Sequence, residues 1–465
     1  MSFRVLGDIV KIKGGKRLPK SSQLQVIKND HPYIRVRDMG ERYLPRNGLE
    51  YVPDNVFPSI SRYIVNTNDL ILSIVGTVGL VSIVDEYFNN ASLTENCVKL
   101  TGLDEKDAKY LYYYLLSQYG KEEIKARTVG AVQPKLPLYN IEKIQIRWFD
   151  KLIREKIVTC LSTLDDKIQL NNQTNQNLES IAQAIFKSWF VDFDPVRAKI
   201  VAKREGKDPE LGAMCSISGK SEEELQQMAK DDFAELQATA ALFPDEFVDS
   251  ELGEVPKGWK VGCIGDEVNT VSKTYPLKQV KEVVFLNTGD ILKGKFLRAN
   301  KSSTEGLPGQ AKKSIQKDDI LYSEIRPQNK RFAYVHFNAE NYVVSTKLMV
   351  LRQKSKVPSH FVYFILSQQS TIDFLQVMAE SRSGTFPQIT FDVLSKVEYL
   401  KPNNDALIDI FTRKVLTPFF EKKVMNETEN NKLLGIRDIV LPKLLSGQLD
   451  LSRLASEAEY ESSTE

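Results

Sequence analysis

Cysteine and histidine are scarce in this sequence. The 465 residues include four cysteines and three histidines: Cys97, Cys160, Cys215, Cys263, His31, His336 and His360. The cysteines lie far apart without disulfide or zinc-site spacing, and the histidines show no metal-ligand spacing. These absences argue against a disulfide scaffold and a structural metal site, and they favour reduced thiols in a cytoplasmic protein.

Long apolar runs are also lacking. No stretch approaches the ~18 apolar residues that would span a bilayer. The opening MSFRVLGDIVKIKGG contains no apolar segment followed by a cleavage site. We therefore expect a cytoplasmic protein without a membrane anchor.

Motifs that would indicate catalysis fail on inspection. Gly219-Lys220-Ser221 resembles the end of a phosphate-binding loop, but Met214 stands where the first glycine belongs. The acidic pair in Asp192-Phe193-Asp194 is better explained as the end of a helix that Pro195 stops. No dinucleotide fingerprint and no Ser-His-Asp or Cys-His set is evident. The pattern indicates a protein that binds rather than reacts, with no catalytic residue and no metal site.

Charge is nearly balanced overall but unevenly distributed. The formal net charge is +2, with 42% hydrophobic and 27% charged residues, as in a globular protein of two to four domains. Residues 203–255 are acidic, so the flanking halves carry the positive excess. An anionic partner must therefore be bound by local basic patches.

The clearest structural signal is a heptad pattern from Ile157 to Trp189. Apolar or asparagine side chains recur in alternating steps of four and three, without Pro or Gly. Such spacing predicts a long helix that buries a narrow stripe against a partner helix, and its asparagines fix the register. A core helix of one larger domain is the alternative, but a length of ~50 Å favours a spacer. The seam comprises Ile157, Leu161, Leu164, Ile168, Asn171, Asn175, Leu178, Ala182, Ile185 and Trp189.

The chain also repeats itself at an offset of about 250 residues. Four motifs recur in the same order, and each copy then leads into a helical tract. The pairs are Gly7-Asp8-Ile9-Val10 with Gly265-Asp266-Glu267-Val268, Asn68–Ser73 with Asp318–Ser323, Tyr113–Gln118 with Tyr363–Gln368, and Gly130–Pro134 with Gly384–Gln388. The plan is domain, helix, domain, helix, with an approximate two-fold relation and antiparallel helices.

Each domain is predicted to be mixed α+β. The first is expected to contain strands at 33–36, 70–75, 78–84 and 141–146 and a helix at 109–118. The second is expected to contain strands at 283–286, 319–324, 331–337 and 342–351 and a helix at 360–366.

Between the copies, the capping box Ser221/Glu224 predicts one helix, Ser221 to Leu242. The second long helix follows Pro418, with a seam at Val424, Asn431, Leu434, Leu441 and Leu445, a kink at Pro442 and a stop at Gly447.

Basic and amide side chains concentrate in predicted loops of both copies. Arg and Lys neutralise phosphates, and Arg, Asn and Gln form the bidentate contacts that distinguish bases. A single such residue is commonly an ordinary surface charge, but the clustering at corresponding loops favours DNA binding. The candidates are Lys16, Arg17, Arg35, Arg37, Arg42, Arg46, Arg127, Gln133 and Lys135 in the first copy, and Lys293, Lys295, Arg298, Lys312, Lys313, Arg326, Gln328, Asn329, Lys330, Arg331, Arg382 and Gln388 in the second.

Taken together, these features resemble the specificity subunit of type I restriction–modification enzymes. The most specific stretches are FKSWFVDFDPVRAK from Phe186, LPKLLSG from Leu441 and Asp165-Asp166-Lys167-Ile168. Gly130-x-x-Gln133-Pro134-x-Leu136 also resembles the loop before the last strand of such target recognition domains, from which Gly384–Gln388 departs. The resemblance covers essentially the whole chain.

The resemblance implies an α+β fold with two similar target recognition domains separated by two long antiparallel helices in a coiled coil. The expected segments are domain 1 (1–150), central spacer helix (151–198), linker with one helix (199–257), domain 2 (258–402), C-terminal spacer helix (403–450) and a disordered tail (451–465). Spacer and docking residues would be Ile157, Leu161, Leu164, Ile168, Leu178, Ile185, Trp189, Leu434, Leu441 and Leu445.

The implied function is sequence-specific binding of a bipartite double-stranded DNA target. The subunit itself would be non-catalytic and without a cofactor. Its partners would be two methyltransferase subunits that bind S-adenosylmethionine and ATP- and Mg-dependent restriction subunits. Three alternatives stay open: a methylation-only or type II-like bipartite system, a coiled-coil scaffold, and a fused methyltransferase or restriction enzyme, whose Asn/Asp-Pro-Pro-aromatic motif is absent from the sequence.

Overall fold

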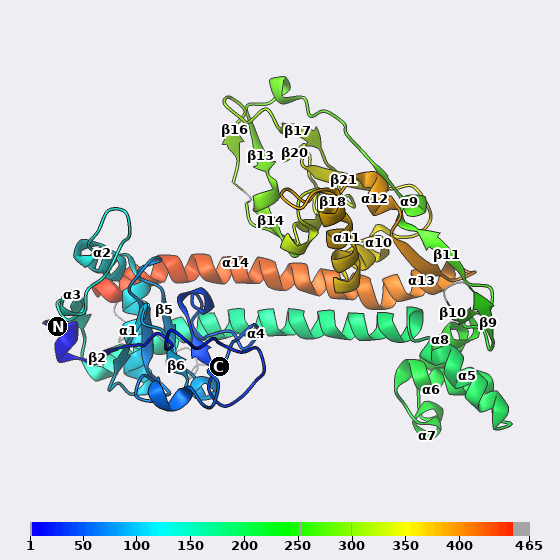
Figure 1. The fold of residues 1–465 in the computed structure, drawn as a ribbon. Coiled ribbons are helices and arrows are strands. Elements are labelled where there is room, and N and C mark those ends of the chain that lie inside the picture. Colours follow the sequence, from blue (N-terminus) through cyan, green and yellow to red (C-terminus); the bar gives the residue numbers. More distant parts are fainter. Residues whose placement is uncertain (1, 251–252, 299, 450–465) are drawn as a thin grey trace, which may run out of the picture. The chain divides into compact units, whose positions relative to one another are not determined.

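The computed structural model describes residues 2–250, 253–298 and 300–449 (Figure 1). The predicted disordered tail, 451–465, lies outside these residues. The chain divides into two compact units, Met1–Gln173 with Asn426–Glu465 (unit 1) and Thr174–Met425 (unit 2). Both boundaries fall inside long helices, so each helix contributes one part to each unit.

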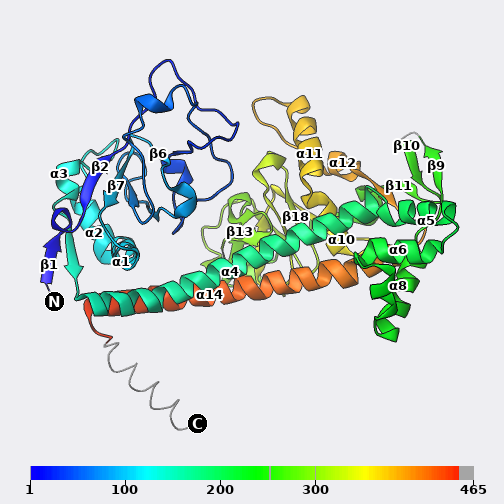
Figure 2. The same cartoon turned by 90° about the horizontal axis from the view of Figure 1, so that it is seen from below.

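The predicted long helices are present. α4 (Lys151–Phe190) is one helix of 40 residues, and α14 (Thr417–Ser446) has 30. Within unit 1 they run antiparallel: Asp165 pairs with Arg437, and Asn171 with Asn430. In unit 2 the other end of α4 meets α13 (Ala406–Phe411), which precedes α14, through Phe190 and Phe411, whose ring centroids are 5.3 Å apart. The views in Figures 1 and 2 show the two helices side by side in each unit.

The heptad seam predicted for α4 faces inward. All ten of its positions are buried or half-buried, including Asn171 at 4% exposure. Asn171 Nδ2 donates to Asn430 Oδ1 at 2.9 Å and to Glu429 Oε2 at 2.8 Å. The predicted seam of α14 needs one correction, because Asn431 is exposed and its neighbour Asn430 faces α4. A polar layer in a coiled coil fixes the register because a shift would leave buried amides unpaired.

Proline shapes the C-terminal helix at two points. A π-helical turn, Thr412–Leu416, lies directly before Pro418 in the first turn of α14. Proline removes one N–H donor and crowds the carbonyl four residues earlier, and a widened turn relieves that crowding. Pro442 lies inside α14, and the helix ends at Ser446 before Gly447, whose φ is +75°. The predicted stop at Gly447 is thus confirmed.

A four-stranded antiparallel sheet forms the centre of the domain in unit 1. Its order is β2 (Lys11–Gly14), β7 (Cys97–Thr101), β4 (Leu70–Ser73) and β5 (Val81–Ile83). β3 (Tyr33–Ile34) and β6 (Ser92–Leu93) pair in parallel, and β1 (Ser2–Val5) pairs with β8 (Gln145–Trp148). The helices are α1 (Glu105–Leu116), α2 (Gln118–Arg127) and α3 (Leu138–Ile141). α3 replaces the start of the strand expected at 141–146.

Unit 2 contains the same sheet in the same order. It consists of β12 (Val268–Thr270), β21 (Leu348–Gln353), β18 (Ile320–Ser323) and β19 (Phe332–Tyr334), all antiparallel. β11 (Lys260–Cys263) pairs with β22 (Glu398–Lys401), as β1 does with β8. The helices are α9 (Ile264–Glu267), α10 (Ser359–Ser367), α11 (Gln369–Arg382) and α12 (Phe391–Ser395). The predicted repeat is therefore a repeat of fold.

A second sheet in unit 2 contains the counterpart of the β3–β6 pair. β13 (Glu282–Leu286) and β20 (Tyr342–Ser345) are parallel, flanked by β16 (Ser302–Ser303) and β17 (Ala311–Ser314). β14 (Ile291–Leu292) and β15 (Lys295–Phe296) form a small hairpin. The strand expected at 342–351 is in fact two strands, because the chain turns at Thr346 and Lys347.

The segment predicted as a linker with one helix is a small helical bundle. Its helices are α5 (Asp194–Arg204), α6 (Pro209–Ser218), α7 (Glu222–Gln226) and α8 (Lys230–Ala241), followed by the hairpin β9 (Phe247–Ser250) and β10 (Gly253–Pro256). The capping box of Ser221 and Glu224 is confirmed. The helix expected from Ser221 to Leu242 is broken because Ala229 adopts an extended conformation, with ψ at 141°.

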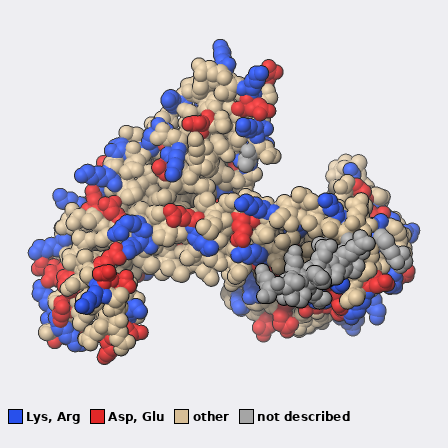
Figure 3. Space-filling view, turned by 180° about the vertical axis from the view of Figure 1, so that it is seen from behind, with Lys and Arg blue, Asp and Glu red and all other residues tan. Residues whose placement is uncertain are grey.

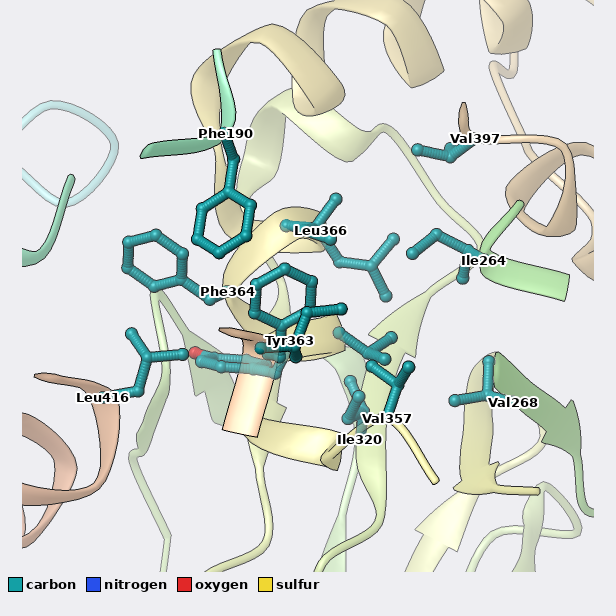
Figure 4. Close-up of a cluster of buried hydrophobic side chains, with 14 of the residues drawn as sticks. Phe190, Ile264, Val268, Ile320, Val357, Tyr363, Phe364, Leu366, Val397 and Leu416 are labelled. Carbon is teal, nitrogen blue, oxygen red and sulfur yellow. The ribbon is translucent and has the colours of Figure 1, made fainter. Parts of the chain in front are cut away.

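Side chains of the long helices belong to the hydrophobic core of each domain. In unit 1, Ile157, Val158 and Leu161 from α4 and Leu444 and Leu445 from α14 join the core of the domain. In unit 2 the core is rich in aromatic side chains. Phe190 from α4 and Phe364 from α10 lie in one cluster with Leu366 and Leu416 (Figure 4). The predicted seam residues therefore stabilise the fold from inside.

Candidate nucleic-acid interface

Two loops meet at the same place in each domain. In unit 1, Leu136 N donates to Ile74 O at 2.9 Å and Gly76 N to Pro134 O at 3.4 Å. In unit 2, Ile389 N donates to Glu324 O at 2.8 Å and Arg326 N to Pro387 O at 3.1 Å. In both domains the loop after the central strand, β4 or β18, is thus joined to the loop before the last short helix, α3 or α12. Side chains of the two loops lie together at this loop junction.

These hydrogen bonds also align the two copies residue by residue. Pro134 corresponds to Pro387 and Leu136 to Ile389, so Lys135 corresponds to Gln388 and Gln133 to Phe386. The sequence pairing of Gly130 with Gly384 is therefore shifted by one residue. The loop itself differs in length, because Gly130 lies four residues before Pro134 and Gly384 lies three residues before Pro387.

The predicted DNA-binding residues of unit 1 fall into two groups. Arg37, Arg46 and Arg17 have exposed side chains, at 62%, 65% and 77%, although each also contacts a carboxylate. Lys16, Gln133 and Lys135 are exposed as well. The other three, Arg35, Arg42 and Arg127, are engaged internally.

The internal group holds the domain together. Arg35 binds the carboxylates of Asp38 and Glu50 with 17% of its side chain exposed. Arg42 binds Asp166 of α4 and is only 10% exposed. The same helix site accepts a hydrogen bond from Tyr113 Oη to Asp165 Oδ2 at 2.8 Å. Arg35, Arg42 and Arg127 differ from the first group in burial, because only 17%, 10% and 21% of their side chains is exposed.

The candidates in unit 2 divide in the same way. Lys293, Lys295, Arg298, Lys312, Arg326, Gln328, Asn329 and Arg382 are exposed. Lys313 Nζ instead donates to Thr346 O and Leu348 O at 3.0 and 2.8 Å, and burial lowers the pKa of its ammonium group. Arg331 donates to Ile291 O at 2.9 Å. Both are structural.

The loop after β18 is held by helix α11. Gln328 Nε2 donates to Asp373 Oδ1 at 2.7 Å, and Lys330 Nζ donates to Gln369 Oε1. Arg326 and Lys330 both adopt positive φ, +43° and +53°. A left-handed conformation costs a non-glycine residue about 1 kcal/mol or more, so the backbone at these two positions is strained.

Sequence reasoning missed an aromatic surface in unit 1. His31 stacks on Phe57 with ring centroids 3.6 Å apart, and both line a hollow of about 690 Å³. Tyr87 lines the same hollow, with Lys28 Nζ and the Arg46 guanidinium 5.8 and 4.9 Å from its ring centroid. Aromatic rings interleaved with cations are typical of surfaces that bind single-stranded nucleic acid, whose bases are free to stack. The segments Lys28–His31 and Phe57 have no periodic pattern that could have marked them in the sequence.

The surface carries charges of both signs. Figure 3 shows Lys and Arg interspersed with Asp and Glu over the face drawn there. Among the described residues no group of three or more His, Cys, Asp or Glu side chains is placed to hold a metal ion. Nor does any helix in the described ranges combine the length and apolarity needed to cross a bilayer.

Comparison with known proteins gives the family. The model for the type I restriction modification DNA specificity domain matches residues 1–180 and 256–404, one match for each copy of the repeat. The chain is 30% identical to the type I restriction enzyme HindI specificity subunit of Haemophilus influenzae, over 94% of this chain and 90% of that protein. It is 23% identical to the MjaIX specificity subunit of Methanocaldococcus jannaschii, over 96% and 93%.

Solved structures were compared as well. The type I restriction–modification S subunit from M. genitalium aligns with a TM-score of 0.49 at 16% identity, over 95% of each chain. The two family matches together cover more than half of the chain. This chain belongs to the family of type I restriction–modification specificity subunits, which recognise bipartite DNA targets, as the sequence resemblance predicted.

Proposed function

We propose that each domain binds one half of the DNA target through the exposed side chains around its loop junction. The observation that carries this proposal is the repeated junction itself: identical backbone pairing, with different side chains in the two copies. Gly76, Gln133 and Lys135 occupy the places of Arg326, Phe386 and Gln388. One scaffold that displays two sets of side chains is suited to two different half-sites.

We assign phosphate binding to exposed cations of each domain. Each Lys or Arg that neutralises a phosphate releases a counterion, so binding weakens as salt rises, with a slope of ~0.9 per contact on a log–log plot. Lys16, Arg17 and Arg37 in unit 1 and Lys293, Lys295 and Lys312 in unit 2 are the candidates. Base contacts fall to Gln133 in the first domain and to Arg326 and Gln388 in the second.

The chain is proposed to act without chemistry of its own. It would assemble with two methyltransferase subunits, which bind S-adenosylmethionine, and with ATP- and Mg-dependent restriction subunits in the cytoplasm. The buried seam of α4 and α14 is occupied within the fold, so docking must use the outer helix faces. Exposed apolar side chains are present there: Leu170 at 57%, Ile181 at 54%, Met425 at 61% and Ile439 at 60%.

The test is salt-dependent DNA binding by the complex assembled with its methyltransferase subunits. Replacing Lys16 with Ala should weaken binding to all duplexes and reduce the salt slope by about 1. Lys207→Ala is the matched control, because Lys207 is 61% exposed in the helical bundle and pairs with Glu205. Binding that is insensitive to salt would favour a protein-interaction scaffold. Methyl transfer by the purified chain alone would favour a fused enzyme.

A further inference from the structure

A carboxylate lies among the cations of the loop junction in unit 2. Glu324 follows β18, and 26% of its side chain is exposed. Lys347 Nζ lies 3.5 Å from Glu324 Oε2 and also 3.5 Å from Gln388 Oε1. The three groups come from three separate segments: the end of β18, the turn between β20 and β21, and the loop before α12.

Two of these groups, Glu324 and Gln388, border a hollow of about 600 Å³. Glu324 and Gln388 line it together with Arg382, Phe386 and Met349. Phe386 is 51% exposed, so it presents an aromatic face next to the carboxylate and the amide. The hollow therefore combines an apolar wall with hydrogen-bonding groups that are open to solvent.

The fold does not require this arrangement, as the first copy demonstrates. Glu324 N donates to Lys347 O at 3.1 Å, and the equivalent hydrogen bond in unit 1 joins Ile74 N to Asn96 O at 2.8 Å. Ile74, Asn96 and Lys135 thus occupy the places of Glu324, Lys347 and Gln388. Because the same backbone forms with an apolar residue at the first position, the carboxylate serves something other than the scaffold.

Lys347 is itself held in place. It belongs to the turn whose Thr346 and Leu348 carbonyls accept hydrogen bonds from Lys313 Nζ. Lys313 is thus a positioning residue for this turn. The Lys347 ammonium group beside Glu324 offsets the negative charge of the carboxylate and limits its repulsion of nearby DNA.

We propose that Glu324, flanked by Gln388, accepts a hydrogen bond from the exocyclic amino group of a base in the half-site of the second domain. This inference rests on the proposed function. A carboxylate is repelled by phosphates, so within a DNA-binding surface its attractive partners are base amino groups. In the major groove these are N4 of cytosine and N6 of adenine, and Glu is a usual acceptor for the former.

The test is target mapping of the assembled methyltransferase complex with Glu324→Gln. Methylated sequences are compared with wild type over a random DNA library. We expect one base position, confined to one half of the target, to lose about tenfold or more of its preference. A lost preference for cytosine identifies N4 as the partner, and a lost preference for adenine identifies N6. Glu398→Gln, an exposed carboxylate on β22, is the control and should leave the target unchanged.

A second variant separates a change in base preference from a loss of folding. Glu324→Ile combined with Lys347→Asn and Gln388→Lys carries the residues of the first copy, which that backbone accommodates. It should unfold at a temperature near that of wild type and change the preference at the same base position. Unchanged preference in both variants, with a specific wild-type complex, would overturn the inference and leave the proposed function standing. A wild-type complex without any sequence preference would instead overturn the proposed function.

Discussion

The positive-φ positions of the loop after β4 are glycines, whereas those of the corresponding loop after β18 are cationic residues. Gly76 and Gly79 have φ of +79° and +95°, and their counterparts Arg326 and Lys330 have +43° and +53°. The correspondence follows from matching hydrogen bonds, Ser73 N to Leu80 O and Ser323 N to Arg331 O. The loop of the second copy is one residue longer than that of the first and has non-glycine residues at positive φ. The second domain thus holds two cationic residues in a left-handed conformation that glycine adopts without steric cost in the first domain.

The two cores differ as well, and truncating the aromatic core should have the largest effect on stability. Phe190 is 4% exposed and packs against Trp259, Phe361 and Phe411. Phe190→Ala should cost about 3–5 kcal/mol in unit 2. Val191→Ala is the control because Val191 is 53% exposed. Hydrogen exchange should show α10 losing protection while α1 keeps it; equal loss in both helices would mean that the units do not unfold separately.

Arginines of the first domain should separate into structural and DNA-binding groups. Arg42→Met removes the partner of Asp166 and a neighbour of Asp165, and should cost about 2 kcal/mol, as for other hydrogen bonds to charged groups. Arg37→Met, at a side chain 62% exposed, should change stability little and weaken DNA binding. Thermal unfolding and duplex binding of both variants test the division. A stable Arg42→Met protein with weakened DNA binding would reverse the assignment.

Acid should destabilise unit 2 selectively. His360 of α10 lies between the rings of Tyr334 and Phe420, and burial lowers its pKa from 6.5 to about 4. The unfolded chain therefore binds more protons between these values, so stability falls as pH drops from about 6.5 towards 4.

The check is hydrogen exchange of α10 against α1 across that pH range. His360→Phe should flatten the pH dependence of α10, because it removes the titrating group and keeps an aromatic ring. A pH profile that His360→Phe leaves unchanged would assign the effect to other groups.

The smallest expected effect on stability is an increase, from glycine at position 326. Arg326→Gly places glycine where the first copy has it, and should stabilise unit 2 by about 1 kcal/mol because the left-handed strain is relieved. The same change should relax sequence preference in one half of the target. Denaturant unfolding and target mapping measure the two effects. Lower stability would show that the hydrogen bond from Arg326 to Thr385 O outweighs the strain.

Periodicity and repetition in the sequence were enough to predict the long helices and the paired domains. The seam from Ile157 to Trp189 is buried or half-buried throughout, and the motifs at Leu70 and Ile320 begin equivalent strands. In α14 the spacing points to Asn431, seven residues after Val424 and three before Leu434, whereas in the structure Asn430 is buried against α4. The helical bundle was missed because its helices are short and begin or end at residues such as Pro209 and Gly219.

The site was harder to predict than the fold. Composition marked the loops but could not tell that Arg42, Lys313 and Arg331 are bound to partners far away in the sequence. Glu324 escaped attention because an acidic residue does not suggest DNA binding. Its significance appears only when hydrogen bonds align it with Ile74 in the other copy.

The central claim is that each domain recognises its own half-site. The most direct measurement is target mapping of the assembled methyltransferase complex carrying Gln133→Ala or, separately, Gln388→Ala. We expect the first variant to alter base preference in one half of the target and the second to alter it in the other half, with the gap between them unchanged. A change in both halves from either single variant would contradict independent recognition by the two domains.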